Sequence, residues 1–185
     1  PSGRGGIAYS AFTTGFFGML VNLLLVFGYQ VIYGNLYHKM AVFLSVFMAG
    51  ISFGALYMTR HMPPADKQEE AFEFLEGLII LFCLCLGPFL ALTDKSGWQL
   101  DLLFFVLFVA PGVLVGLEFP LLANLFCQAD IAKNTPRSGS LIYAADSAGG
   151  WLAGLLTGAI LLPVFGLSGS CFIAISLKLS SLFFV

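Results

Sequence analysis

The stretch LIYAADSAGGWLAGLLTGAILLP at residues 141–163 is long and apolar enough to cross a membrane, yet it carries an aspartate. A helix needs about 20 predominantly apolar residues to cross a hydrocarbon core of about 30 Å. Asp146 stands about two helical turns from the start of the stretch, and Gly149 and Gly150 follow it. An ionised carboxylate at the centre of a membrane helix costs about 2.5–3.5 kcal/mol, so it faces a cavity or a partner, or it holds a proton. The stretch therefore predicts a membrane helix built around an acid.

The composition of the whole chain supports this interpretation. Of its 185 residues, 59% are hydrophobic and 10% are charged, whereas a soluble domain has about 25% charged residues. A soluble protein of this length has no interior large enough to bury so much apolar surface. The chain is therefore expected to be an integral membrane protein with the lipid bilayer as its main partner. It has a net charge of -2 and no basic stripe, which argues against nucleic-acid binding.

Six apolar segments follow one another along the chain and predict an all-α integral membrane protein, a bundle of six transmembrane helices in one domain over residues 1–185. The expected helices are 9–32, 40–59, 72–92, 102–126, 140–162 and 169–185. Distortions are expected at three prolines that lie inside these segments, Pro88, Pro111 and Pro120. The first residues, 1–6, are interpreted as a linker from an upstream domain.

Lysine and arginine are more frequent on one side of the predicted bundle. The richer side holds the N-terminus and connectors 60–71 and 128–139, with Arg4, Arg60, Lys67, Lys133 and Arg137. The other connectors carry only Lys39 and Lys95. The positive-inside rule then predicts that the richer side, with both chain ends, is cytoplasmic. The expected location is a bacterial inner membrane.

Glycines recur at a spacing of four residues in three segments. The series are Gly50 and Gly54, Gly112 and Gly116, and Gly150, Gly154 and Gly158. This spacing puts small residues on one helix face, where another helix backbone can approach closely. Packing inside one bundle and a sliding or dimer interface are both open interpretations. The fifth segment is expected to be central and closely contacted.

Polar residues inside or beside the apolar segments are the candidate ligand-binding residues. They are Asp146, Tyr143, Glu118, Glu76, Gln30 and Asn22. Tyr143 is three residues before Asp146 and is expected on the same helix face. For the acids, cation or proton handling and a structural hydrogen bond between helices are both open, and Glu76 also suits a helix N-terminus. Lys178, inside the last segment, is expected to face protein or to extend toward a membrane surface.

No catalytic residue, metal site or cofactor is indicated. The chain has no nucleophile elbow, phosphate-binding loop or His/Glu metal signature. The Cys83-Leu-Cys85 spacing does not fit a zinc knuckle, and the cysteines are expected to be small packing residues. Whether the chain belongs to an enzyme is left open by these residues.

Three ordered pieces of the chain resemble the membrane part of spermidine-synthase-like integral membrane proteins, which are related to polyamine aminopropyltransferases. They are GFFGMLVNLLLVFGYQVIYGNLYHKMAVFLSVFMAGISFGA (15–55), GLEFPLLANL (116–125) and GSLIYAADSAGGWLAGLLTGAILLPVFG (139–166). The resemblance implies a transporter-like bundle that accompanies a soluble synthase-like domain or partner subunit. The 185 residues contain no such soluble domain and no acidic motif for a polyamine, so transfer chemistry is not assigned to them.

Two functions are open from the sequence. In the first, the bundle transports or senses a small cation such as a polyamine, and Asp146, Glu118 and Glu76 converge on one cavity with Tyr143 and Gln30. In the second, it is a membrane anchor or assembly module for a soluble aminopropyltransferase-like enzyme or a partner complex. The acids are then hydrogen-bonded separately to neighbouring helices, and no continuous cavity exists. A quinone-linked redox subunit is a weaker third interpretation.

Overall fold

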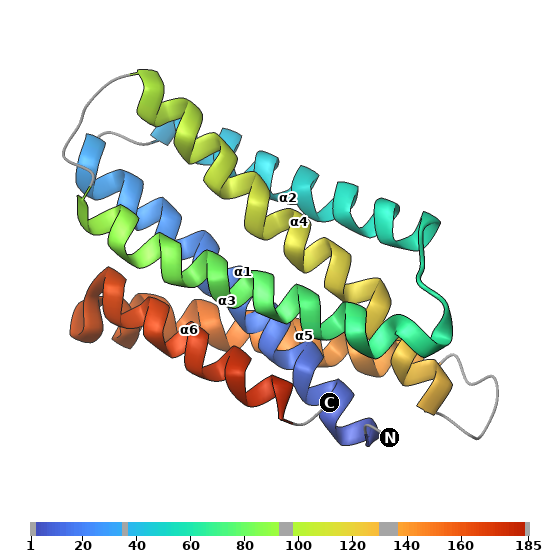
Figure 1. Ribbon diagram of the computed structural model, residues 1–185. Helices are drawn as coiled ribbons and strands as arrows, with labels where there is room; N and C mark the ends of the chain where they lie inside the picture. The colour runs from blue at the N-terminus through green and yellow to red at the C-terminus, as the bar shows by residue number, and fades with distance from the viewer. Residues whose placement is uncertain (1–2, 35–36, 93–97, 130–136, 184–185) are drawn as a thin grey trace.

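The computed structural model describes residues 3–34, 37–92, 98–129 and 137–183, which form an all-α bundle with no strand among them (Figure 1). Its helices are α1 (Arg4–Tyr33), α2 (Tyr37–Arg60), α3 (Gln68–Leu92), α4 (Trp98–Ala129), α5 (Arg137–Leu156) and α6 (Gly166–Leu182). A short 3-10 turn (Ala65–Lys67) precedes α3, and a π-helix (Thr157–Phe165) joins α5 to α6. The predicted all-α class is confirmed.

Five helical stretches, rather than the six predicted, are long and apolar enough to cross a membrane. The segments predicted at 140–162 and 169–185 belong to one run of 44 residues, Gly139–Leu182. Gly166 adopts the left-handed region at the end of the π-helix, with φ 68°, and α6 then returns along the bundle (Figure 1). With its 17 residues, α6 alone is about 26 Å long, slightly less than the hydrocarbon thickness.

The helices extend beyond the predicted apolar segments. Helix α1 begins at Arg4 rather than at residue 9, inside the segment interpreted as a linker. Helix α3 begins at Gln68 rather than at residue 72, and Glu69 and Glu70 in its first turn suit the positive end of the helix dipole. Apolar residues mark the part of a helix that suits lipid, whereas α3 itself also includes Gln68, Glu69 and Glu70, which have good helix propensity.

Helix α3 continues through Pro88, and α4 continues through Pro111 and Pro120. The described departures from α-helical geometry within the long apolar runs are the 3-10 turn at Ala65–Lys67 and the π-helix that contains Pro163. A wider turn accommodates a residue that lacks an N–H and whose ring clashes with the carbonyl four residues earlier.

The outside of the bundle is apolar. Large hydrophobic side chains are strongly exposed on several helices, including Trp151 at 69%, Phe172 at 65% and Phe53 at 64%. Soluble monomers rarely expose contiguous apolar surface of this extent, and such surface marks contact with a membrane or a partner. The exposed side chains and the five long apolar helices together suit a membrane protein.

Helix α1 is the central helix. Of its most apolar 18-residue window, 61% is buried, whereas the fifth segment is strongly exposed at Tyr143, Trp151 and Leu155. The prediction that the fifth segment is central is therefore wrong. Helix α5 packs closely on α1, but its opposite side carries the exposed Trp151 and Leu155. In addition, α2 packs along α4, and α3 packs along α6.

The glycines of α2 and α4 bring two helix backbones into direct contact. A Cβ added to Gly54 would collide with the Val113 carbonyl, and one added to Gly116 would collide with the Ile51 carbonyl. On α5 the tight contact is made by Gly149 against α1, whereas a Cβ on Gly158 would meet nothing within 4 Å. The packing interpretation is thus confirmed for the α2–α4 glycines, which are used inside the bundle.

Polar contacts identify which helix ends lie together. The Tyr9 hydroxyl is 2.8 Å from Ser180 Oγ, and the Arg4 guanidinium lies 5.2 Å from the centre of the Phe126 ring. The start of α1 and the ends of α4 and α6 therefore share one end of the bundle, as predicted for the chain's two termini. The predicted cytoplasmic orientation of this end stays a prediction. Lys95 and Lys133, which entered that prediction, lie outside the described residues.

Candidate functional site

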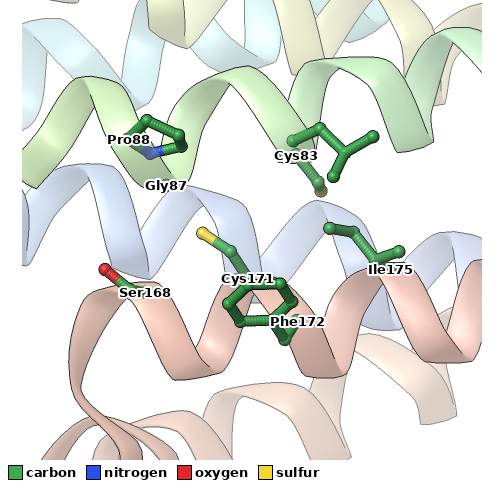
Figure 2. A pocket seen from close by; sticks show the side chains of 8 residues that line it. Cys83, Gly87, Pro88, Ser168, Cys171, Phe172 and Ile175 are labelled. Atoms are coloured by element: carbon green, nitrogen blue, oxygen red, sulfur yellow. The ribbon is translucent and has the colours of Figure 1, made fainter.

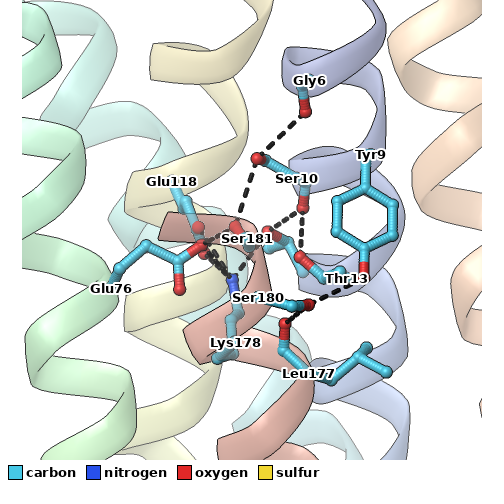
Figure 3. A network of polar contacts seen from close by, with 11 residues as sticks. Gly6, Tyr9, Ser10, Thr13, Glu76, Glu118, Leu177, Lys178, Ser180 and Ser181 are labelled. Carbon is cyan, nitrogen blue, oxygen red and sulfur yellow. Dashed lines mark hydrogen bonds and ion pairs between the residues drawn. The ribbon is translucent and has the colours of Figure 1, made fainter. Parts of the chain in front are cut away.

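A fully buried lysine lies at the meeting point of four helices. Lys178 Nζ on α6 donates to Glu118 Oε1 at 2.8 Å and Oε2 at 3.0 Å, to Glu76 Oε1 at 3.1 Å and to Thr14 Oγ1 at 3.0 Å (Figure 3). These partners come from α4, α3 and α1. Lys178, Glu76 and Glu118 each have a relative exposure of 0%. Of the two alternatives predicted for Lys178, the one that faces protein is confirmed.

Hydroxyl groups of α1 and α6 complete this network. The Ser181 hydroxyl donates to Glu76 Oε1 at 2.7 Å and lies 3.1 Å from Ser10 Oγ. The Thr14 hydroxyl donates to the Ser10 carbonyl at 2.8 Å and accepts from Lys178 Nζ. Among the described residues, Glu76 Oε2 has no hydrogen-bond partner. One carboxylate oxygen of the network is therefore still able to accept a proton or another donor.

The charges of this network do not cancel when every group is ionised. Two carboxylates and one ammonium then carry a net charge of about -1, which is costly in a fully buried site. One proton or one further cation restores neutrality. The cavity that Asp146 lines does not include Glu76, Glu118 or Lys178.

Asp146 occupies a second polar site, where α5 packs against α1. A Cβ on Gly15 would collide with the Asp146 carbonyl, so the absence of a side chain at residue 15 permits this close approach. Asp146 and Asn22 both line a cavity of about 300 Å³ between α1, α2, α4 and α5. In each residue the Oδ1 atom is buried and has no hydrogen-bond partner among the described residues.

The six candidate residues are not brought together in one cavity, contrary to the cation hypothesis as first stated. Glu76 and Glu118 meet at Lys178, and Asp146 and Asn22 share the cavity beyond α1. Tyr143 is 65% exposed on α5, because residues three apart differ by about 60° around a helix. Gln30 is partly buried in the last turns of α1, eight residues from Asn22 and thus about 12 Å along the axis.

A third polar cluster lies at the other end of the bundle. Lys39 Nζ is 2.7 Å from Asp101 Oδ2 and donates to the Tyr29 hydroxyl at 2.7 Å, while that hydroxyl donates to Asp101 Oδ1 at 2.6 Å. The side chains of Lys39 and Asp101 are 45% and 40% exposed. Water or headgroups thus screen this pair, unlike the pair at Lys178, and its role is to join the starts of α2 and α4.

Asp101→Asn is expected to lower the free energy of unfolding by less than about 1 kcal/mol, since exposed ion pairs contribute little. The asparagine keeps an oxygen that accepts from Tyr29. Reversible unfolding in mixed detergent at low and high salt measures this effect, and the difference between wild type and variant should shrink at high salt. A loss of several kcal/mol would show that this cluster is desolvated in the membrane.

An apolar cavity of about 300 Å³ lies between α3 and α6 and is lined by Cys83, Gly87, Pro88, Cys171, Phe172 and Ile175 among others (Figure 2). It contains no charged group, and Cys83 and Cys171 are buried with free thiols. The buried positions of Cys83 and Cys171 suit the expected packing role, whereas Cys85 and Cys127 are exposed. Among the described residues, no group of three or more His, Cys, Asp or Glu side chains is placed to hold a metal ion.

Comparison of the chain with protein-family models, with curated proteins and with solved structures found no match.

Proposed function

We propose that this chain is an integral membrane domain that transports or senses a small cation, and that the Glu76–Lys178–Glu118 network takes up and releases a proton in that process. The observation that carries the proposal is the meeting of two buried carboxylates on one buried ammonium. Ionisable groups inside a membrane bundle are costly, and they typically belong to ion pathways or proton relays.

The geometry of Lys178 supports an exchange of partners. Its ammonium is held by two acids on two different helices, so a proton that arrives on one acid weakens that bond and leaves the other intact. The unpartnered Glu76 Oε2 is a suitable first acceptor for this proton. A change at Lys178 is passed on to α1 through Thr14, because the Thr14 hydroxyl accepts from Lys178 Nζ and donates to the Ser10 carbonyl.

The resemblance to spermidine-synthase-like membrane proteins gives this proposal a candidate substrate, a polyamine, and a candidate setting, a bacterial inner membrane with the N-terminus cytoplasmic. Helix α6 returns along α3 after Gly166, which supports a further proposal that it crosses the bilayer separately as a sixth helix.

The proposal is tested by uptake of labelled small amines into proteoliposomes with an imposed proton gradient. Glu118→Gln preserves side-chain shape and removes the charge, and it is expected to lower gradient-driven uptake at least tenfold, because Lys178 then holds only one acid that can ionise. Glu73→Gln is the matched control, since Glu73 is exposed on the same helix as Glu76. Equal uptake by wild type, Glu118→Gln and empty liposomes would refute transport.

The membrane-anchor function is the second candidate, and one observation favours it. Lys178 holds both Glu76 and Glu118, so the three charged side chains join α3, α4 and α6 in one buried contact. An anchor needs only this stable packing and a partner, such as the soluble synthase-like domain that the resemblance implies. Purification from the native membrane under mild detergent, followed by mass measurement, would identify such a partner.

A further inference from the structure

We propose that the cavity between α1, α2, α4 and α5 binds a primary alkylammonium ion with a single positive charge. The ammonium head lies at Asp146 and Asn22, and the alkyl tail lies along the apolar wall of the cavity. This inference rests on the proposed function only in taking the ligand to be a cation. It concerns a site distinct from the Lys178 network. Its ligand carries one charge and a donor head group, and it is therefore not the polyamine that the family resemblance implies.

The polar groups of the cavity require a hydrogen-bond donor. Asn22 is 5% exposed, and Oδ1 of Asn22 and Oδ1 of Asp146 have no partner among the described residues. A buried acceptor without a partner is costly. A primary ammonium offers three N–H donors and a charge that complements the carboxylate. An anion offers neither, and it would be repelled by Asp146.

Helix periodicity explains how the sequence forms this cavity. Gly15, Gly18, Met19 and Asn22 line it from one face of α1, because they follow the spacing i, i+3, i+4 and i+7. Asp146, Ser147 and Gly150 line it from α5. The three glycines leave space where side chains would otherwise meet. A Cβ on Gly18, for example, would lie 3.2 Å from Val115 Cγ2.

The rest of the cavity wall favours a ligand with a single positive charge. It is formed by apolar side chains of α2 and α4, namely Leu44, Phe47, Met48, Ile51 and Val115. Asp146 is the one charged residue among those that line the cavity. The second ammonium of a diamine or polyamine would therefore lie against apolar groups without a counter-charge, which is unfavourable. A hydrocarbon tail suits the same surface.

The cavity opens sideways, toward the region that lipid occupies. Met48 and Leu44 are 53% and 46% exposed, and Met19 is 38% exposed. Asp146 lies about 10 Å along the helix from Gly139, where the apolar run begins. Lipid headgroups lie at the membrane surface rather than at this depth, so the proposed ligand is a free amphiphilic amine that enters from the hydrocarbon side.

Isothermal titration calorimetry of the purified 185-residue chain in lipid nanodiscs tests this inference. The probes share a six-carbon chain: hexylammonium, trimethylhexylammonium, 1,6-hexanediammonium and 1-hexanol. Hexylammonium is expected to bind at least tenfold more tightly than the other three. The trimethyl probe keeps the charge without N–H donors, the diammonium adds a second charge, and the alcohol has no charge. Equal affinity for hexylammonium and the diammonium would overturn the selectivity for one charge.

Variants assign the binding to the cavity. Asp146→Asn and Asn22→Leu are each expected to weaken hexylammonium binding about tenfold, whereas Asp66→Asn, at an exposed residue outside α3, leaves it unchanged. Binding by Asp146→Asn at wild-type strength would mean partition into the bilayer and would refute the site. If both variants fail to fold, the probe series on the wild type decides. Hexylammonium binding by the wild type, together with wild-type uptake no greater than that of empty liposomes, would leave this site standing while the proposed transport function fails.

Discussion

Lys178→Met is expected to lower the free energy of unfolding by about 3–5 kcal/mol, the range found when one partner of a buried ion pair is removed. Methionine fills a similar volume, but Glu118 and Glu76 would then face each other without the ammonium that binds both. Like charges in a buried site repel strongly or must take up protons. Unfolding in mixed detergent, followed by circular dichroism, measures the loss.

Two control variants distinguish the effect of unpaired buried charge on the free energy of unfolding from the effect of losing a long lysine side chain. Lys39→Met removes an ammonium from an exposed pair and is expected to cost less than about 1 kcal/mol. The triple variant Lys178→Met, Glu76→Gln, Glu118→Gln removes all three charges and is expected to recover most of the lost stability, because no uncompensated charge is left. Equal stability of Lys178→Met and wild type would contradict the ion network.

Gly116→Ala is expected to destabilise the bundle by about 1–3 kcal/mol, the usual cost of an overpacked contact. The added methyl group would collide with the Ile51 carbonyl of α2, and a backbone carbonyl cannot rotate away as a side chain can. Helices α2 and α4 would have to move apart along their shared glycine faces. The change is measured as a fall in the melting temperature of the purified protein in a fixed detergent.

Gly77→Ala is the matched control for this effect. Gly77 lies inside α3, and a Cβ there would meet nothing within 4 Å. The same substitution is therefore expected to be neutral or to stabilise by up to about 1 kcal/mol through helix propensity. If the two alanine variants melt at the same temperature, the close approach of α2 to α4 is not a feature of the folded protein.

The fold class was predictable because long apolar runs with few charges have few structural solutions in lipid. The number of membrane-spanning helices was harder to predict from the sequence. Residues on both sides of Pro163 are apolar, so composition did not indicate that the fifth and sixth segments form one run with a π-helix at its centre. Which helix is central also depends on packing. Glycine content did not identify it, because α1 and α5 have similar numbers of glycines.

The sequence indicated which polar residues belong to candidate sites, but it did not indicate which of them lie together. Glu76 and Glu118 stood out as acids in apolar segments, and Lys178 as a cation in another. That all three meet depends on how α3, α4 and α6 are aligned, which no local pattern encodes. The excess of buried acids over nearby cations was the one available signal for this pairing. The division into two sites arises because Thr14 contacts Lys178 of α6 whereas Gly15 contacts Asp146 of α5. Adjacent residues of a helix point about 100° apart.

Proton exchange at the Glu76–Lys178–Glu118 network is tested most directly by infrared difference spectroscopy of the protein in lipid bilayers, recorded while pH is stepped and while an amine is added. We predict a protonated-carboxyl band that changes with both treatments, is lost or shifted in Glu118→Gln and is preserved in Glu73→Gln. A carboxyl spectrum that responds to neither treatment while the protein stays folded would contradict the exchange. The network would then be a fixed structural contact, as the membrane-anchor function requires.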